Sequence, residues 1–341
     1  SALIAGYAKD GQGHEALNCF ERMQMEGITP DSITFICILQ ACGSTRSIDK
    51  GKQIHEEVVS RGLLEKKDIV LGTALVDMYA KCGLLGKALD IFNRLLVRDV
   101  ISWNAIIAGY ANNGFGEEAL KYYGLMQAEG VSPDVVTFTC ILKACGTSGA
   151  AHIGQEIHQQ VEKGKLLERD SVICNALLDM YIKCGLLGKA REVFENLSFR
   201  NVVTYTALIT GYSQLGESGI VFDFFNRMII EGIKPNSVTF ISILSVCCHE
   251  GLVEKGEVLF HAMCEMHRIS PSPQHLTCMV DLLGGSGFLL EAEDFLHVVP
   301  HQPTIVPWTS LLNSCRIFND VDIAEHCFEH VVDMDESCAS A

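Results

Sequence analysis

The sequence predicts an all-α protein, an α-solenoid of stacked helix-turn-helix units. The first observation is an internal repeat, because MYAKCGLLGKA at 78–88 recurs with one change at 180–190. The second is apolar residues at helical spacing, as in the pattern EALxxFxxM from Glu15 to Met23. The third is that no window alternates with period 2 for long enough to favour a sheet.

Each repeat of about 102 residues divides into three units with a common pattern. A first apolar helix carries a small residue and an aromatic, as in Trp103 to Tyr110, and a glycine turn follows at Gly114. The second helix is ended by Pro-Asp or Pro-Asn, as at Pro133-Asp134, which also begins the next unit. Two short helices cannot bury an apolar face alone, so stacked units should form a concave and a convex surface.

The composition limits the function classes. The chain has 341 residues, 48% of them hydrophobic and 20% charged, with a formal net charge of −16. This apolar content excludes general disorder, and no run of about 18 apolar residues suits a membrane span. The acidity argues against binding nucleic acid through bulk charge alone. The 15 cysteines show no CxxC spacing, so we expect buried free thiols in a reducing compartment.

Several motifs resemble those of the pentatricopeptide repeat family, in its plant subclass with alternating P, L and S motifs. GYxxxG followed by EALxxFxxM and Pro-Asp resembles the P motif, ILQACG with GKQIH the L motif, and ALVDMYAKCG the S motif. The segment from Pro307 to Arg316 resembles the extension (E) motif that ends such arrays. The resemblance implies a right-handed superhelix that binds single-stranded RNA along its concave groove, one motif per base.

The resemblance also sets a motif register. Because Ser1 takes the fifth position of its motif and Ala341 lacks a closing cap, we expect a fragment of a longer polypeptide. The predicted boundaries are P 1–31, L 32–68, S 69–99, P 100–134, L 135–170, S 171–201, P 202–236, L 237–272, S 273–304 and a truncated extension motif 305–341.

In this family the fifth and last residues of each motif choose the base. The chemistry is reasonable, because hydroxyl, amide and carboxylate groups distinguish donors from acceptors on a base edge. The implied pairs are Ser1 with Asp31 (guanine), Thr73 with Asp99 (guanine), Asn104 with Asp134 (uracil), Thr139 with Asp170 (guanine-like), Asn175 with Asn201 (cytosine, or uracil more weakly) and Thr206 with Asn236 (adenine).

The remaining motifs are expected to contribute little to base recognition. The pairs without a polar fifth residue, or without a family match, are Ile36 with Asp68, Ile241 with Ser272, and Thr277 with Thr304. Read in parallel, the expected RNA site is about G-N-G-U-(G)-Y-A-N-N.

Two further positions carry a binding role in the family. The second residue of each motif packs against the base planes, although a β-branched residue that opens a helix can also serve packing alone. These residues are Ile33, Val70, Ile101, Val136, Val172, Val203 and Val238, and Gln274 departs from the pattern. Position 13 is lysine in three motifs and would meet phosphates, the alternative being a solvated helix end. These lysines are Lys9, Lys81 and Lys183.

We expect no catalytic residue, no metal site and no cofactor in this segment. His55-Glu56-Glu57 matches H-x-E of the zinc deaminases, but no P-C-x-x-C follows. The stretch His326 to His330 matches H-x-x-E-H, but no third ligand is evident. Ordinary helix packing is the preferred interpretation of both.

The function that the resemblance implies is sequence-specific recognition of organellar RNA for C-to-U editing. A deaminase would be fused downstream or supplied by a partner, and the chain would act as a monomer without membrane contact. A protein-binding helical scaffold and an RNA stabilisation or maturation factor are the alternatives. Polar residues recurring at the fifth and last positions favour RNA over peptide. We expect a mitochondrial location, with the chloroplast as alternative.

Overall fold

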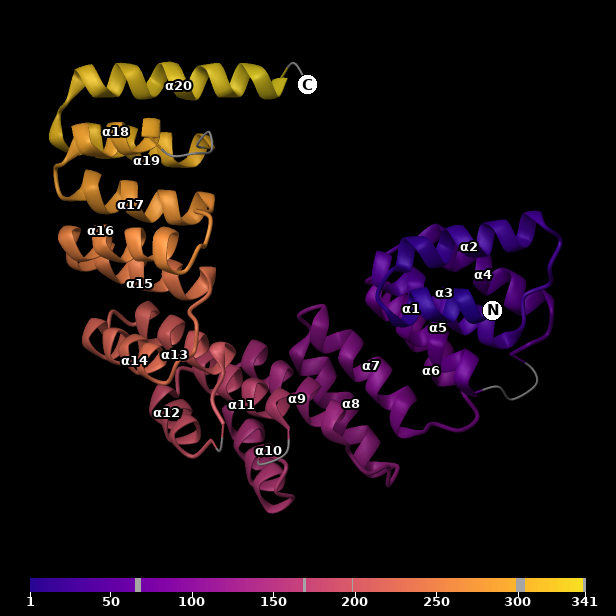
Figure 1. The fold of residues 1–341 in the computed structure, drawn as a ribbon. Coiled ribbons are helices and arrows are strands. Elements are labelled where there is room, and N and C mark those ends of the chain that lie inside the picture. Colours follow the sequence, from indigo (N-terminus) through magenta and orange to yellow (C-terminus); the bar gives the residue numbers. More distant parts are fainter. Residues whose placement is uncertain (65–68, 168–169, 198, 299–303, 340–341) are drawn as a thin grey trace. The chain divides into compact units, whose positions relative to one another are not determined.

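The computed structural model describes residues 1–341 except 65–68, 168–169, 198, 299–303 and 340–341. Every regular element within these described residues is helical, which confirms the predicted all-α class (Figure 1). No helix in the described part of the chain combines the length and apolar character that crossing a membrane requires. The chain divides into two compact units, Ser1–Leu186 and Leu187–Ala341, which are described separately.

The first unit contains eleven described helices. They are α1 Ala2–Lys9, α2 Gly13–Met25, α3 Ser32–Thr45, α4 Ile48–Ser60, α5 Ile69–Lys81, α6 Leu85–Arg94, α7 Val100–Asn112, α8 Gly116–Ala128, α9 Val135–Ser148, α10 Ala151–Lys163 and α11 Ser171–Lys183. The odd-numbered helices contact one another in chain order and form one layer. Each even-numbered helix packs on the odd-numbered helix before it and on the odd-numbered helix after it.

The second unit repeats this arrangement. Its described helices are α12 Leu187–Glu195, α13 Val202–Gln214, α14 Ser218–Ile230, α15 Ser237–Glu250, α16 Val253–His261, the π-helix η1 Ala262–Met266, α17 Pro273–Gly285, α18 Leu289–Val298, α19 Ile305–Phe318 and α20 Val321–Ala339. Helices α13, α15, α17 and α19 form the continuous layer. The odd-numbered helices from α3 onwards begin at the first residue of each predicted motif, although the motif boundaries themselves stay a prediction.

Aromatic side chains hold successive helix pairs together. The Phe92 ring of α6 meets Trp103 of α7 edge-on, with ring centroids 4.9 Å apart. In the second unit Phe194 of α12 meets Tyr205 of α13 in the same way at 4.8 Å. All four rings are buried. Edge-to-face contact between large buried rings adds to the burial of their area, so these pairs join one motif firmly to the next.

Close packing against α9 leaves no room for a side chain at Gly116, the first residue of α8. A Cβ added to Gly116 would lie 2.7 Å from the Ala144 backbone oxygen and 2.8 Å from Thr147 Oγ1 in α9. A backbone atom cannot move without distorting its helix, so Gly116→Ala should lower the free energy of unfolding by about 1–3 kcal/mol. Gly124→Ala lies in the same helix and meets nothing within 4 Å. It should raise stability by up to about 1 kcal/mol, because alanine favours helix over glycine.

Urea denaturation followed by circular dichroism measures both glycine variants. Equal stability changes at Gly116 and Gly124 would contradict the close approach of α8 to α9.

A buried histidine caps α17. His275 Nδ1 accepts a hydrogen bond from the Ser272 backbone N–H at 3.0 Å, and its Nε2 lies 3.0 Å from the Ser237 carbonyl oxygen. A carbonyl only accepts, so the neutral ring carries its proton on Nε2. Burial lowers the pKa of His275 below its ordinary value, while the Ser237 hydrogen bond acts in the opposite direction.

This cap predicts a pH-dependent stability. A depressed folded-state pKa means that the contribution of His275 is complete above the unfolded pKa of about 6.5 and is lost as pH falls through the folded pKa. The melting temperature should therefore drop between about pH 7.5 and about pH 5.5. His275→Gln keeps a donor and an acceptor without titrating, so its drop should be smaller. An identical drop in both proteins would disprove the role of His275.

Candidate nucleic-acid interface

The last residue of most predicted motifs is the N-cap of the next first helix. A short side-chain acceptor suits this place, because the first helical N–H groups have no partner within the helix. Asp31 accepts from the Thr34 N–H at 2.8 Å, and Asp99 accepts from the Ser102 N–H at 2.8 Å. The other residues that cap in this way are Asp134, Asp170, Asn201 and Asn236. Capping therefore holds the predicted base-reading side chains in place.

The fifth and last residues meet directly in the motif 100–134. Asn104 Nδ2 donates to Asp134 Oδ1 at 2.9 Å. The buried Thr137 hydroxyl, on the third residue of α9, donates to Asn104 Oδ1 at 2.6 Å. Burial raises the pKa of the Asp134 carboxyl, but hydrogen bonds from Thr137 and Asn104 outweigh it and lower that pKa overall. The carboxylate is thus ionised at neutral pH and belongs to a closed hydrogen-bonded group.

Two more predicted P motifs connect their pair through a threonine, and in the first of them Ser1 Oγ also lies 3.4 Å from both Asp31 carboxylate oxygens. Ser1 Oγ lies 2.8 Å from Thr34 Oγ1, which donates to Asp31 Oδ1 at 2.5 Å. Hydrogen bonds from the side chain and backbone of Thr34 lower the pKa of Asp31. The third group consists of Thr206, Asn236 and Thr239, and Thr206 Oγ1 lies 2.7 Å from Thr239 Oγ1. We call these three sets, Ser1–Asp31–Thr34, Asn104–Asp134–Thr137 and Thr206–Asn236–Thr239, the P triads.

The predicted pairs of the S and L motifs in the first unit are not joined by hydrogen bonds among the described residues. Thr73 is 7% exposed, and its Oγ1 finds no partner in the described part of the chain. Thr139 donates back to the Val135 carbonyl of its own helix at 2.8 Å, while Asp170 accepts from the Val172 N–H.

The other predicted pairs are placed as follows. Asn175 is the fifth residue of α11 in the first unit, and Asn201 is the N-cap of α13 in the second unit. Asp68, the partner of Ile36, lies outside the described residues. Thr277 donates to the Pro273 carbonyl of its own helix at 2.9 Å, and Thr304 precedes α19 without a side-chain capping bond.

The second residues of the motifs are exposed apolar side chains. Each stands at the second position of a first helix, and between 50% and 63% of its surface is accessible. They are Ile33, Val70, Ile101, Val136, Val172, Val203 and Val238. A β-branched side chain that only filled the core would be buried, so these positions keep apolar surface available beside the reading pairs.

The position-13 lysines differ in their surroundings. Lys81 Nζ forms an ion pair with Asp77 at 2.7 Å, and Lys183 Nζ pairs with Asp179 at the same distance. Both pairs are one helical turn apart and exposed, where such bonds are weak and exchange readily. Lys9 is exposed at the end of α1. Phosphate contact by these lysines stays a prediction.

Family models decide the class of this protein. The model described as the PPR repeat family matches residues 1–44, 98–147 and 200–249. The model described as the PPR repeat matches residues 73–100, 172–202 and 238–267. Together they match more than half of the chain. The chain belongs to the pentatricopeptide repeat family.

Curated pentatricopeptide repeat proteins of Arabidopsis thaliana are similar throughout. A mitochondrial protein is 35% identical over 98% of this chain and 53% of its own length. Another mitochondrial protein is 36% identical over 100% of this chain and 40% of its own. A chloroplastic protein is 36% identical over 91% of this chain and 42% of its own. The chain thus spans about half the length of the curated relatives that it matches.

Solved pentatricopeptide structures share the fold. PPR10 from maize covers 99% of this chain at a TM-score of 0.58 and 18% identity, over 59% of its own chain. PPR10 in complex with an 18-nt psaJ RNA element covers 97% of this chain at a TM-score of 0.67 and 19% identity, over 53% of its own. This likeness confirms the predicted solenoid of stacked helix pairs.

The remaining candidate histidine motifs have the following side-chain partners. His55 Nδ1 lies 2.9 Å from the Tyr79 hydroxyl, and His326 Nδ1 lies 3.0 Å from Glu293 Oε1. His330 instead stacks on Trp308 with ring centroids 4.1 Å apart, so the two histidines of H-x-x-E-H have different partners. The described residues contain no group of three or more potential metal ligands. Burial raises the pKa of the Cys42 thiol to about 12, as expected for an inert core cysteine.

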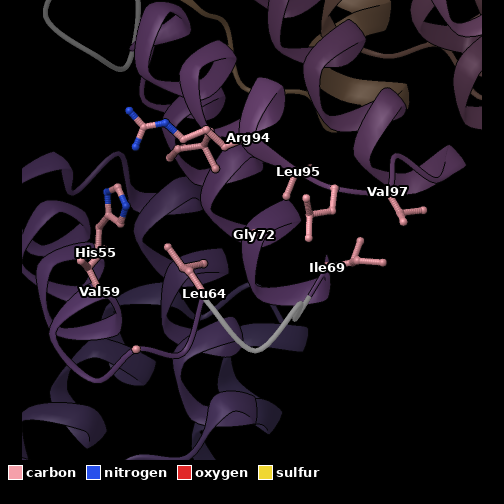
Figure 2. A pocket seen from close by; sticks show the side chains of 11 residues that line it. His55, Val59, Leu64, Ile69, Gly72, Arg94, Leu95 and Val97 are labelled. Atoms are coloured by element: carbon pink, nitrogen blue, oxygen red, sulfur yellow. The ribbon is translucent and has the colours of Figure 1, made fainter.

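One pocket of about 460 Å³ lies among α4, α5 and α6 (Figure 2). His55 and Arg94 stand on one side of it, and apolar side chains such as Ile69 and Val97 stand on the other (Figure 2). None of the predicted base-reading or base-packing residues lines it.

The threonines of the P triads were not among the functional residues predicted from the sequence. Their signal is the spacing D-x-x-T or N-x-x-T at Asp31, Asp134 and Asn236, which indicates an N-cap. The spacing reveals the cap, but it does not reveal that the same hydroxyl reaches a fifth residue about 33 residues upstream.

Proposed function

We propose that this chain binds single-stranded RNA in a sequence-specific manner, one motif per base. The observation that carries the proposal is the P triad with its exposed apolar neighbour. In the motif 100–134, for example, Asn104 and Asp134 form a hydrogen-bonded pair, and Ile101 and Val136 leave more than half of their surface accessible. Polar pairs beside apolar surfaces suit unstacked bases, which need edge hydrogen bonds and cover for their faces.

The proposed contacts differ from those of a basic RNA binder. The chain has a net charge of −16, and two of its three candidate phosphate lysines are paired with aspartates. Affinity should therefore depend on base contacts more than on phosphate contacts. We expect weak binding to random RNA and a shallow dependence of affinity on salt.

Fluorescence anisotropy tests the proposal. The probe is the RNA 5′-GAGUGCAAA-3′, which matches the expected site, and the control RNA has the same composition in scrambled order. Binding to the matched RNA should be at least about tenfold tighter, because each mismatched base edge costs about 1–3 kcal/mol. Equal affinity for the two RNAs would overturn the proposal.

We further propose a role in C-to-U editing of organellar transcripts. The predicted alternation of P, L and S motifs and the predicted extension motif at 305–341 support it, as does the naming of relatives as mitochondrial or chloroplastic. The chain would supply recognition, and a deaminase from a downstream segment or a partner would supply the chemistry. We place the protein in the mitochondrion.

Sequencing of organellar transcripts tests this second proposal. In plants with the gene disrupted, a cytidine a few nucleotides 3′ of the expected site should lose its conversion to uridine. Unchanged conversion at every organellar site would overturn the editing role and leave RNA binding to its own test.

A further inference from the structure

We propose that the buried threonine of each P triad enforces the base preference of the fifth and last residues, because it fixes the direction of the hydroxyl proton in the group. This inference rests on the proposed RNA-binding function. The threonines are Thr34, Thr137 and Thr239, each the third residue of a first helix. All three are fully buried, so they act on the base through the fifth and last residues rather than by touching it.

Hydrogen-bond directions in the third triad follow from simple valence. Asn236 Oδ1 accepts from the Thr239 backbone N–H and from Thr239 Oγ1, both at 2.9 Å. The single hydroxyl proton of Thr239 is therefore given to Asn236. Thr206 Oγ1 lies 2.7 Å from Thr239 Oγ1, and both contacts of Thr239 are hydrogen bonds only when Thr206 supplies the proton between the two hydroxyls, which is the direction we assign.

This direction defines what the third triad presents to RNA. Thr206 has used its proton and offers only lone pairs, while Asn236 has used its oxygen and offers its NH₂ group. Adenine presents the complementary edge, an amino donor next to the N1 acceptor. Guanine presents the reverse order, an oxygen acceptor next to an N–H donor. Its O6 lone pair would therefore face the lone pairs of Thr206.

The first triad has the same proton direction with a different last residue. The Asp31 carboxylate only accepts, so Thr34 donates to it at 2.5 Å, and we assign the Ser1 proton to Thr34 at 2.8 Å rather than to the Asp31 oxygens at 3.4 Å. Ser1 and Asp31 then both present acceptors. Guanine supplies two neighbouring donors, N1–H and N2–H₂, on its Watson–Crick edge.

In the second triad the proton is directed the opposite way. Because the Asp134 carboxylate only accepts, the NH₂ group of Asn104 must face it, which leaves Asn104 Oδ1 facing Thr137. Thr137 Oγ1 also lies 3.0 Å from Asp134 Oδ1, but its single proton goes to the closer Asn104 Oδ1 at 2.6 Å, so Thr137 donates towards the fifth residue instead of receiving from it. Asn104 keeps one N–H and one lone pair, which match the O4 and N3–H of uracil.

The chain contains a natural comparison. At the start of α11 the third residue is Ile173, which has no hydroxyl. There the fifth residue Thr139 donates to its own helix instead of to the next motif. Between this helix start and the three P triads, the bridge thus accompanies the threonine.

The test uses Thr239→Val with Thr239→Ser as the rescue and Thr204→Val as the matched control. Thr204 is the third residue of α13, is 1% exposed, and donates to the Asn201 backbone oxygen at 2.9 Å. Both valine variants therefore remove a buried capping hydroxyl, but only Thr239→Val removes the bridge to Thr206. Dissociation constants are measured for two RNAs that differ only by A or G opposite the motif 202–236, and melting temperatures are measured in parallel.

Wild type should prefer the A-containing RNA, and Thr239→Val should reduce the A-to-G preference about five- to tenfold, since Thr206 is freed to donate. Thr239→Ser and Thr204→Val should keep the wild-type ratio. A wild type that binds both RNAs equally would overturn the proposed base reading, and the threonine's role with it. A wild type that discriminates, with an equal ratio in Thr239→Val, would overturn the threonine's role alone.

Discussion

Phe92→Ala should lower the free energy of unfolding of the first unit by about 3–5 kcal/mol. The ring is 1% exposed, and its removal leaves a cavity against Trp103. It also removes the cation–π contact of Arg98, whose guanidinium carbon lies 5.0 Å from the ring centroid. Because each helix pair is stabilised mainly by its neighbours, the loss uncouples the motif 69–99 from the motif 100–134.

Urea denaturation followed by tryptophan fluorescence and by circular dichroism measures the change at Phe92. Phe115→Ala is the control, because this ring is 48% exposed beside Tyr110. It should cost less than about 1 kcal/mol. A cost below about 1 kcal/mol for Phe92→Ala as well would show that the aromatic pair does not join the two motifs.

The double variant Asn104→Thr with Asp134→Asn should change the base preferred by the motif 100–134 from uracil to adenine. It reproduces the composition of the third triad, because Thr137 is already present to bridge the new pair. Asparagine caps a helix about as well as aspartate, so stability should be preserved. Two edge hydrogen bonds are exchanged, which predicts a change of about 10- to 100-fold in the U-to-A affinity ratio.

Anisotropy with RNAs varied only at that base measures the switch. Asp134→Asn also removes a negative charge, which strengthens RNA binding regardless of sequence. Asp10→Asn removes the same charge at an exposed site outside the triads and serves as the control. It should raise affinity for both RNAs equally. An unchanged U-to-A ratio in the double variant would refute base reading by this pair.

Much of the fold could be predicted because its units are local. Helical spacing, glycine turns and Pro-Asp stops lie within a few residues of one another, so a short window contains the signal for each helix. The sequence predicted that neighbouring motifs stack, but not which side chains meet between them. That Phe92 packs on Trp103, and that α8 approaches α9 so closely at Gly116, depends on how neighbouring helices lie against each other.

For the candidate site, the residues could be predicted but most of their hydrogen-bond partners could not. The pairs of fifth and last residues came from the family resemblance, and three of them lie together in the P triads. That Lys81 has Asp77 as an ion-pair partner follows from spacing of one helical turn, a signal present in the sequence but not used. No sequence pattern indicates that Thr73 Oγ1 lacks a hydrogen-bond partner among the described residues.

The amino-acid sequence alone determined the all-α class, the repeated units and the caps, because periodicity and capping act between residues close in the chain. The tertiary structure alone decided which hydroxyl reaches which reading residue, and the proton direction that we propose rests on those contacts. Thr239 and Thr206 lie 33 positions apart and meet only when two motifs stack. A hydrogen bond depends on tenths of an ångström and on direction, and spacing along a chain specifies neither across a helix–helix contact.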